Sequence, residues 1–180
     1  MQHLRLMLAV AVLSVVAGVP GSSLVGIWSN VEVSKGEDPH ASGIEVEIWR
    51  DKGLMFGFFS EYVGPVADPP VGKLDSIHFD EKTGAISFTS RLSVGVVPAA
   101  QGNAWVPSRN LYEFKGVVGK DGMVGTLRRK SVQVEGTELA YDENVTLKTK
   151  AAAGDLPPNE SFDDWTKRWN EALKKRGPKW

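Results

Sequence analysis

Residues suited to acid–base, nucleophilic or metal chemistry are scarce in this chain of 180 residues. It contains no cysteine, and outside the N-terminal segment its histidines are His40 and His78. These two are far apart in the sequence and do not follow a metal-ligand spacing. The chain also lacks a Gly-x-Ser-x-Gly elbow, a phosphate-binding loop and a His-Glu-x-x-His pattern. We therefore predict no catalytic residue, no metal site and no cofactor, and an isomerase-like or hydrolytic enzyme ranks last among the functional hypotheses.

A few polar side chains stand at strand positions whose neighbours are apolar, and these are better candidates for a binding role. Arg129 shares a strand face with Leu127, so it would place a cation at one end of the folded core, unless it reaches water from the strand end. Tyr62 and Tyr112 would offer hydroxyls to the head group of a ligand. Trp105 lies in a long loop, where it would act either as a lid or as an ordinary surface cap.

The elements that would position these side chains are strands. Ile44, Val46 and Ile48 alternate with more polar residues, which is the pattern of a half-buried strand. Two of the intervening residues, Glu45 and Glu47, lie on the opposite face and are therefore expected to face solvent rather than form a catalytic pair.

Turn residues recur at short, regular intervals between the strand-like runs. They predict three hairpins: 44–49 with 54–63, 73–79 with 85–94, and 109–118 with 123–132. A first strand at 24–32 and one or two final strands within 138–150 bring the number to about eight. We predict an all-β fold, an antiparallel up-and-down β-barrel of about eight strands with a C-terminal α-helix.

The C-terminal region is predicted to be a linker followed by an amphipathic helix. Asn159 or Ser161 would cap this helix, with acids in its first turn and bases in its last, as the helix dipole favours. The apolar face would pack on the outside of the barrel, or the 161–176 helix would bind a protein partner. The residues that recur at helical spacing are Phe162, Trp165, Trp169 and Leu173.

The N-terminus has the features of a secretory signal peptide. Arg5 precedes a short apolar run at 6–16, and small residues with a proline follow at 17–23. The alternative, a membrane or buried helix, would need a longer apolar run to span a bilayer. We expect cleavage between Gly18 and Ser23 and a secreted or periplasmic protein. The predicted domains are a signal peptide at 1–22, a β-barrel at 23–150, and a linker and helix at 151–180.

Composition narrows the classes of partner. The chain is 42% hydrophobic and 24% charged, which fits one globular domain, and its formal net charge is −1. This balance gives no field that would attract nucleic acid or an anionic membrane. No later segment is long and apolar enough to cross a bilayer, so we do not expect an integral membrane protein. Glycosylation sequons at Asn144 and Asn159 matter only in a eukaryote.

The first predicted strand carries the one local motif that resembles a known family. Gly26-Ile27-Trp28 resembles the Gly-x-Trp motif that opens the lipocalins and related barrels of the calycin group, and the 24–30 stretch is similar to the opening strand of avidin-type barrels. Repeated hairpins and a C-terminal helix extend the lipocalin resemblance. The chain lacks the Thr-Asp-Tyr-like second motif, and Arg128 or Arg129 would have to be the arginine that packs over the tryptophan.

Strand parity suggests which residues face inward. The 54–63 strand has one face with Phe56, Phe58 and Tyr62 and another with Phe59 and Glu61. The first of these faces supplies three of our candidate ligand-binding residues. On the next two strands, the residues expected to face inward include Ile77, Phe79, Ile86 and Phe88.

The lipocalin resemblance implies a barrel whose interior holds either its own side chains or one small ligand. An apolar and aromatic lining suits a hydrophobic or amphipathic molecule. We therefore hypothesise an exported barrel that carries a small apolar ligand. The alternative is a protein-interaction or inhibitor module of the cell envelope or extracellular space that uses its loops and C-terminal helix. The candidate ligand-binding residues are Trp28, Phe56, Phe58, Tyr62, Phe88, Trp105, Tyr112, Phe114 and Arg129.

Overall fold

The computed structural model describes residues 21–35, 39–65, 69–98, 105–107, 109–134, 137–156 and 159–176. The expected signal peptide thus lies almost wholly outside the described residues. The elements are β1 (Ser23–Ser29), β2 (Glu32–Val33), β3 (His40–Asp51), β4 (Leu54–Pro65), β5 (Val71–Phe79), β6 (Ala85–Val94), β7 (Val96–Pro98), β8 (Trp105–Pro107), β9 (Leu111–Gly119), β10 (Gly122–Val134), β11 (Thr137–Ala152) and α1 (Phe162–Arg176).

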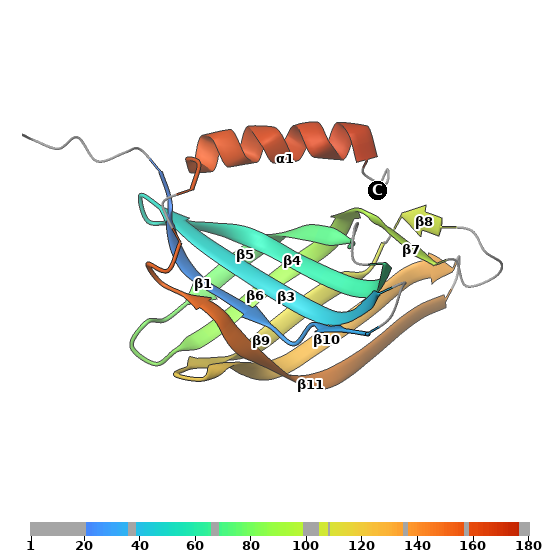
Figure 1. The fold of residues 1–180 in the computed structure, drawn as a ribbon, viewed down its shortest axis with the longest axis horizontal. Helices are drawn as coiled ribbons and strands as arrows, with labels where there is room; N and C mark the ends of the chain where they lie inside the picture. The colour runs from blue at the N-terminus through green and yellow to red at the C-terminus, as the bar shows by residue number, and fades with distance from the viewer. Residues whose placement is uncertain are drawn as a thin grey trace, which may run out of the picture.

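Eight antiparallel strands close into an up-and-down barrel in the order β1-β11-β10-β9-β6-β5-β4-β3, and β1 pairs with β3 to complete the circle (Figure 1). The short strand β2 adds to the edge of β3, and β7 pairs with β8 apart from the barrel. The predicted fold class is confirmed, as are the three predicted hairpins. The last strand, β11, runs two residues into the expected linker, to Ala152.

The turn between β3 and β4 shows how local sequence determines a hairpin. Lys52 and Gly53 both have positive φ, at 49° and 86°. Two successive positive φ values define the tight turn whose twist matches that of the flanking strands, and glycine adopts this conformation without steric cost. Residue pairing then continues without interruption from Asp51↔Leu54 to His40↔Pro65.

The Gly-x-Trp motif has a clear packing role. Trp28 points into the barrel and is buried, and its indole ring lies so close to Gly26 that a Cβ at that position would collide with the ring. Glycine is therefore required by the tryptophan that follows it. The arginines considered as its cover lie elsewhere: Arg129 lies over the rings of Tyr112 and Tyr141, with its Cζ 5.3 and 5.9 Å from their centroids.

Aromatic side chains fill the middle of the barrel. Phe59 stacks on Tyr112 with their ring centroids 4.5 Å apart, and Phe88 stacks on Phe114 at 5.1 Å. The two pairs meet through Phe59 and Phe88, whose ring centroids are 6.4 Å apart. All four residues are at least 98% buried. The centre of the barrel is thus occupied by its own side chains.

Helix α1 packs on the outer face of β3 and β4, as predicted for the apolar face of the helix (Figure 1). Trp165 and Trp169 are only 3% and 6% exposed. The ring centroid of Trp165 lies 5.0 Å from that of Phe56, and the centroid of Trp169 lies 5.6 Å from that of Phe58. Phe56 and Phe58, which we expected inside the barrel, therefore lie outside it beneath α1. Parity could not distinguish the two faces of β4 because both are apolar.

Two caps hold the start of α1. The Ser161 hydroxyl accepts a hydrogen bond from the backbone N–H of Asp164 (3.2 Å) and donates one to its carboxylate (2.8 Å). The carboxylate of Asp51, at the end of β3, accepts a hydrogen bond from the backbone N–H of Phe162 (3.0 Å). Ser161 is thus the predicted N-terminal cap, and Asp51 ties the helix start to the β3–β4 turn.

A helix docked through Trp165 predicts a large cost for removing that side chain. We expect Trp165→Ala to lower the free energy of unfolding by about 3–5 kcal/mol, because a nearly fully buried indole is lost and a cavity remains. Urea unfolding followed by far-UV circular dichroism measures this change. Glu171→Ala, at an exposed position of the same helix, is the control and should change the free energy by less than about 0.5 kcal/mol. Equal costs for the two variants would show that α1 is not docked.

Candidate functional site

Strands β4 and β5 separate along most of their length, and this leaves a cleft in the barrel wall. Within the described residues, the two strands pair only from Ser60↔Val71 to Phe58↔Lys73. A bulge in β5 between Asp75 and His78 includes Ser76 at a positive φ of 51°. Because a bulge bends its strand, β5 continues along β6 and diverges from β4.

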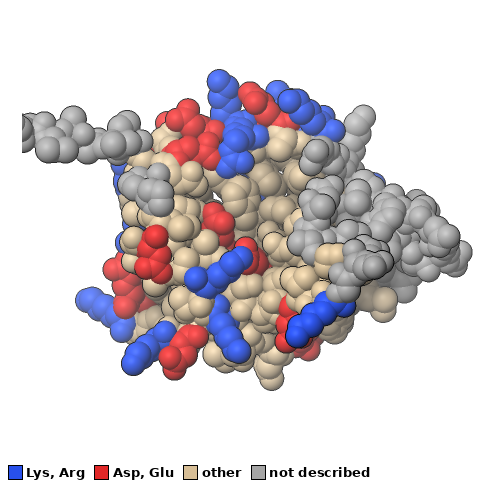
Figure 2. All heavy atoms as spheres, viewed as in Figure 1, with Lys and Arg blue, Asp and Glu red and all other residues tan. Residues whose placement is uncertain are grey.

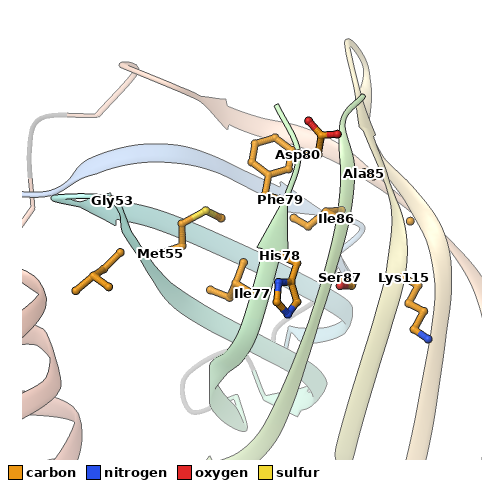
Figure 3. Close-up of a pocket in the computed structure, with 12 residues that line it drawn as sticks. Gly53, Met55, Ile77, His78, Phe79, Asp80, Ala85, Ile86, Ser87 and Lys115 are labelled. Carbon is orange, nitrogen blue, oxygen red and sulfur yellow. The ribbon is translucent and has the colours of Figure 1, made fainter. Parts of the chain in front are cut away.

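The cleft between the diverging strands has a volume of about 900 Å³. Its apolar base consists of inward-facing side chains that pack against the barrel core, and Ile77 and Phe79 extend from β5 toward β4 (Figure 3). More polar residues from β5, β6, β9 and the β5–β6 turn line the rest. The apolar lining includes Leu54, Met55, Ile77, Phe79 and Ile86, and the polar lining includes His78, Asp80, Ser87 and Lys115.

The charged groups around the cleft carry both signs. Asp80 accepts hydrogen bonds from the backbone N–H of Lys82 (2.9 Å) and the hydroxyl of Thr83 (2.8 Å). These bonds, led by the one from Lys82, lower the pKa of Asp80, so its carboxylate is a fixed anion that also shapes the β5–β6 turn. With Lys115 also lining the cleft, the lining does not select a ligand of one charge.

An ion pair joins the end of β3 to the β5–β6 turn beside the cleft. Arg50, at the end of β3, lies 2.5 Å from the carboxylate of Glu81 in the β5–β6 turn. Both side chains are partly exposed, so the pair contributes little to stability.

The opposite end of the barrel is closed by a polar cluster. Glu61 is 2% exposed and forms an ion pair with Arg129. Arg129 donates hydrogen bonds from Nε to the hydroxyl of Tyr112 and from Nη1 to that of Tyr141, both at 2.7 Å. Asn110 donates from Nδ2 to the Glu61 carboxylate at 3.2 Å. Burial is the main cause that raises the pKa of Tyr112, so its hydroxyl stays neutral.

The nine predicted ligand-binding residues occupy different environments. Trp28, Phe88, Tyr112 and Phe114 fill the barrel interior, and Arg129 lies at one end of the barrel, where it is paired with Glu61. Phe56 and Phe58 lie beneath α1.

Tyr62 is on the outer face of the barrel beside Glu45. Burial is the main cause that raises the pKa of Tyr62, and the carboxylate of Glu45 raises it further. The backbone of Trp105 belongs to β8, but its side chain lies outside the part that the structure describes. Of the eight described side chains, none lines the cleft.

The cleft itself was not predicted as a site, although three of its residues were expected to face inward. Ile77, Phe79 and Ile86 do pack against the barrel core. Alternation shows which way a side chain points, but not whether two neighbouring strands stay paired. Glu61 was also missed, although strand alternation could have indicated it. Glu61 lies on the same face of β4 as the inward-facing Phe59, and Arg129 lies on the same face of β10 as the inward-facing Leu127. Two opposite charges on inward faces could have suggested a buried ion pair.

The described residues contain neither a metal-ligand cluster nor a membrane-spanning helix. No group of three or more histidine, aspartate or glutamate side chains there is arranged to hold a metal ion. Among the same residues, no helix combines the length and apolar character needed to cross a bilayer.

Breaking the Glu61–Arg129 pair is expected to destabilise the fold. Arg129→Met leaves the buried Glu61 carboxylate without its counter-ion, so the free energy of unfolding should fall by about 3–5 kcal/mol. Adding Glu61→Leu in the same chain should recover much of the loss, because no uncompensated charge remains. Arg128→Met is the matched control, since Arg128 is exposed and lies 3.9 Å from Asp142. A cost for Arg129→Met no larger than for this control, in urea unfolding, contradicts the assignment.

Comparison with known proteins identifies no relative: no protein-family model, no curated protein and no solved structure matches the chain.

Proposed function

We propose that this chain is an exported, lipocalin-like barrel that carries a small amphipathic ligand, with the apolar part of the ligand in the cleft between β4 and β5. The observation that carries the proposal is the cleft itself. Its volume of about 900 Å³ lies within the range of small-molecule sites, and its apolar base with a few polar groups suits an amphipathic ligand, although the cleft is broadly open to solvent. The N-terminal pattern of a basic residue, a short apolar run and small residues supports export.

The packing of the barrel favours this cleft over the closed interior. Stacked rings occupy the middle, and the Glu61–Arg129 pair with its tyrosine partners occupies the far mouth. A ligand would therefore enter from the side, where β4 and β5 part. The unbranched side chain of Met55 can adjust its shape to an apolar guest at little cost.

The alternative function, a protein-interaction module that uses α1, is less well supported. The apolar face of α1 is already covered by Phe56 and Phe58, so its tryptophans are not available while the helix is docked. On the face shown in Figure 2, acidic and basic side chains are interspersed, which gives no single-sign patch for a charged partner.

A fluorescent fatty acid, cis-parinaric acid, tests the carrier function. We expect it to bind the full chain, and Ile77→Gln to weaken binding about tenfold, or about 1.4 kcal/mol, because an amide replaces apolar surface at the base of the cleft. Leu54→Arg changes the exposed rim without touching the core and should also weaken binding. The control is Val124→Gln, at an exposed position on β10.

Two results would overturn the carrier proposal. One is that the unaltered protein neither binds cis-parinaric acid nor retains a small molecule in native mass spectrometry. The other is that Ile77→Gln and Leu54→Arg bind the probe as tightly as Val124→Gln, with far-UV circular dichroism showing all three folded.

A further inference from the structure

A second pocket lies on the outside of the barrel, where α1 meets β3 and β4. Its volume is about 310 Å³. One wall comes from the barrel strands and the other from the helix, so the two walls can be compared for charge and hydrogen bonding. The residues that matter are Glu45, Glu47, Phe58 and Ser60 on the barrel and Arg168 and Trp169 on α1.

The barrel wall carries excess negative charge. Glu45 forms an ion pair with Lys150 at 2.8 Å, and this hydrogen bond is the main cause that raises the pKa of Lys150. Glu47 lies two residues further along the same strand face and is partly buried. Its carboxylate accepts a hydrogen bond from Nε1 of Trp49, and within the described residues it has no ion-pair partner. Two carboxylates and one ammonium leave one negative charge on this wall.

The helix wall offers a hydrogen-bond donor that is not used. Trp169 is 6% exposed and lines the pocket, and its buried Nε1–H has no hydrogen-bond partner among the described residues. A buried donor without a partner is costly, so an acceptor that reaches this nitrogen through a small shift of the indole ring would be favourable there.

Each wall also contributes an aromatic residue that suits a cation. Arg168 lies with its Cζ 5.9 Å from the ring centroid of Phe58, so this ring already has a cation near it. The charge of Arg168 is balanced by Glu160, to which Nε donates at 2.8 Å. Arg168 therefore does not neutralise Glu47, and the aromatic faces of Phe58 and Trp169 would add attraction for an organic cation.

We propose that this pocket binds a small organic monocation that carries an acceptor oxygen, with Glu47 as the counter-charge and the Trp169 indole N–H as the hydrogen-bond donor. The site is separate from the β4–β5 cleft and does not depend on the carrier proposal.

A chemically matched set of three probes distinguishes the contribution of the Glu47 charge from that of the Trp169 hydrogen bond. Choline has the cation and the oxygen, tetramethylammonium has only the cation, and 3,3-dimethylbutan-1-ol is the uncharged analogue of choline.

Titration of the full chain with each probe, followed by isothermal calorimetry and by the indole N–H resonance of Trp169, tests the site. We expect choline to bind most tightly, tetramethylammonium more weakly, and 3,3-dimethylbutan-1-ol at least about tenfold more weakly than choline. Glu47→Gln should weaken choline binding about tenfold. Glu171→Gln removes the same charge from an exposed position of α1 and should leave binding unchanged.

Trp169→Phe isolates the hydrogen bond, because it keeps an aromatic ring and removes the donor. Choline should then bind no better than tetramethylammonium. The proposal is overturned if choline does not bind, if the uncharged alcohol binds equally well, if Glu47→Gln behaves like Glu171→Gln, or if the Trp169 resonance does not shift. Choline should not displace cis-parinaric acid, so loss of either activity leaves the other site to be judged separately.

Discussion

The stacking of four aromatic rings across the middle of the barrel is the interaction on which the rest of this structure depends. Phe59 and Tyr112 form one stacked pair and Phe88 and Phe114 the other, and the strands that supply them are β4, β6 and β9. Because protein interiors pack densely, rings of this size leave no room for a ligand between them. They divide the barrel into two ends with different chemistry. One end contains the buried Glu61–Arg129 ion pair with its tyrosine and asparagine partners. The other end contains an apolar cleft that opens to the side of the barrel.

Much of the architecture could be predicted because each hairpin carries its own local signals. The alternation of Ile44, Val46 and Ile48 identifies the inner face of β3, and the Lys52-Gly53 turn fixes its pairing with β4. For β4 itself the same reasoning failed. Phe56 and Phe58 are covered by a helix more than a hundred residues away in the sequence, so their face is as apolar as the one with Phe59. The two tryptophans of α1 require an apolar surface somewhere on the barrel, and only the fold shows that β4 provides it.

The candidate sites were harder to predict than the fold, and for a physical reason. Each candidate site depends on how different strands and the helix are arranged in space, and the residue pattern within a single strand does not show this arrangement. Strand parity left two positions open for Arg129, a mouth of the barrel or water at the strand end, and it gave no indication of the partner Glu61, which lies across the barrel interior. The cleft arises because a bulge near Ser76 redirects β5, and a bulge changes the pairing of strands without a distinctive residue pattern. The export of the chain and its ligand binding stay predictions.

The hydrogen bond from the backbone of Phe162 to Asp51 joins parts of the molecule that otherwise have separate roles. Asp51 begins the turn whose next residues, Gly53 and Leu54, form part of the cleft. The β3–β4 turn is therefore attached both to the rim of the cleft and to the start of the helix that lines the outer pocket. The two sites do not overlap, so binding at one leaves room for binding at the other, and any free energy transmitted between them through this turn would be the same in both directions.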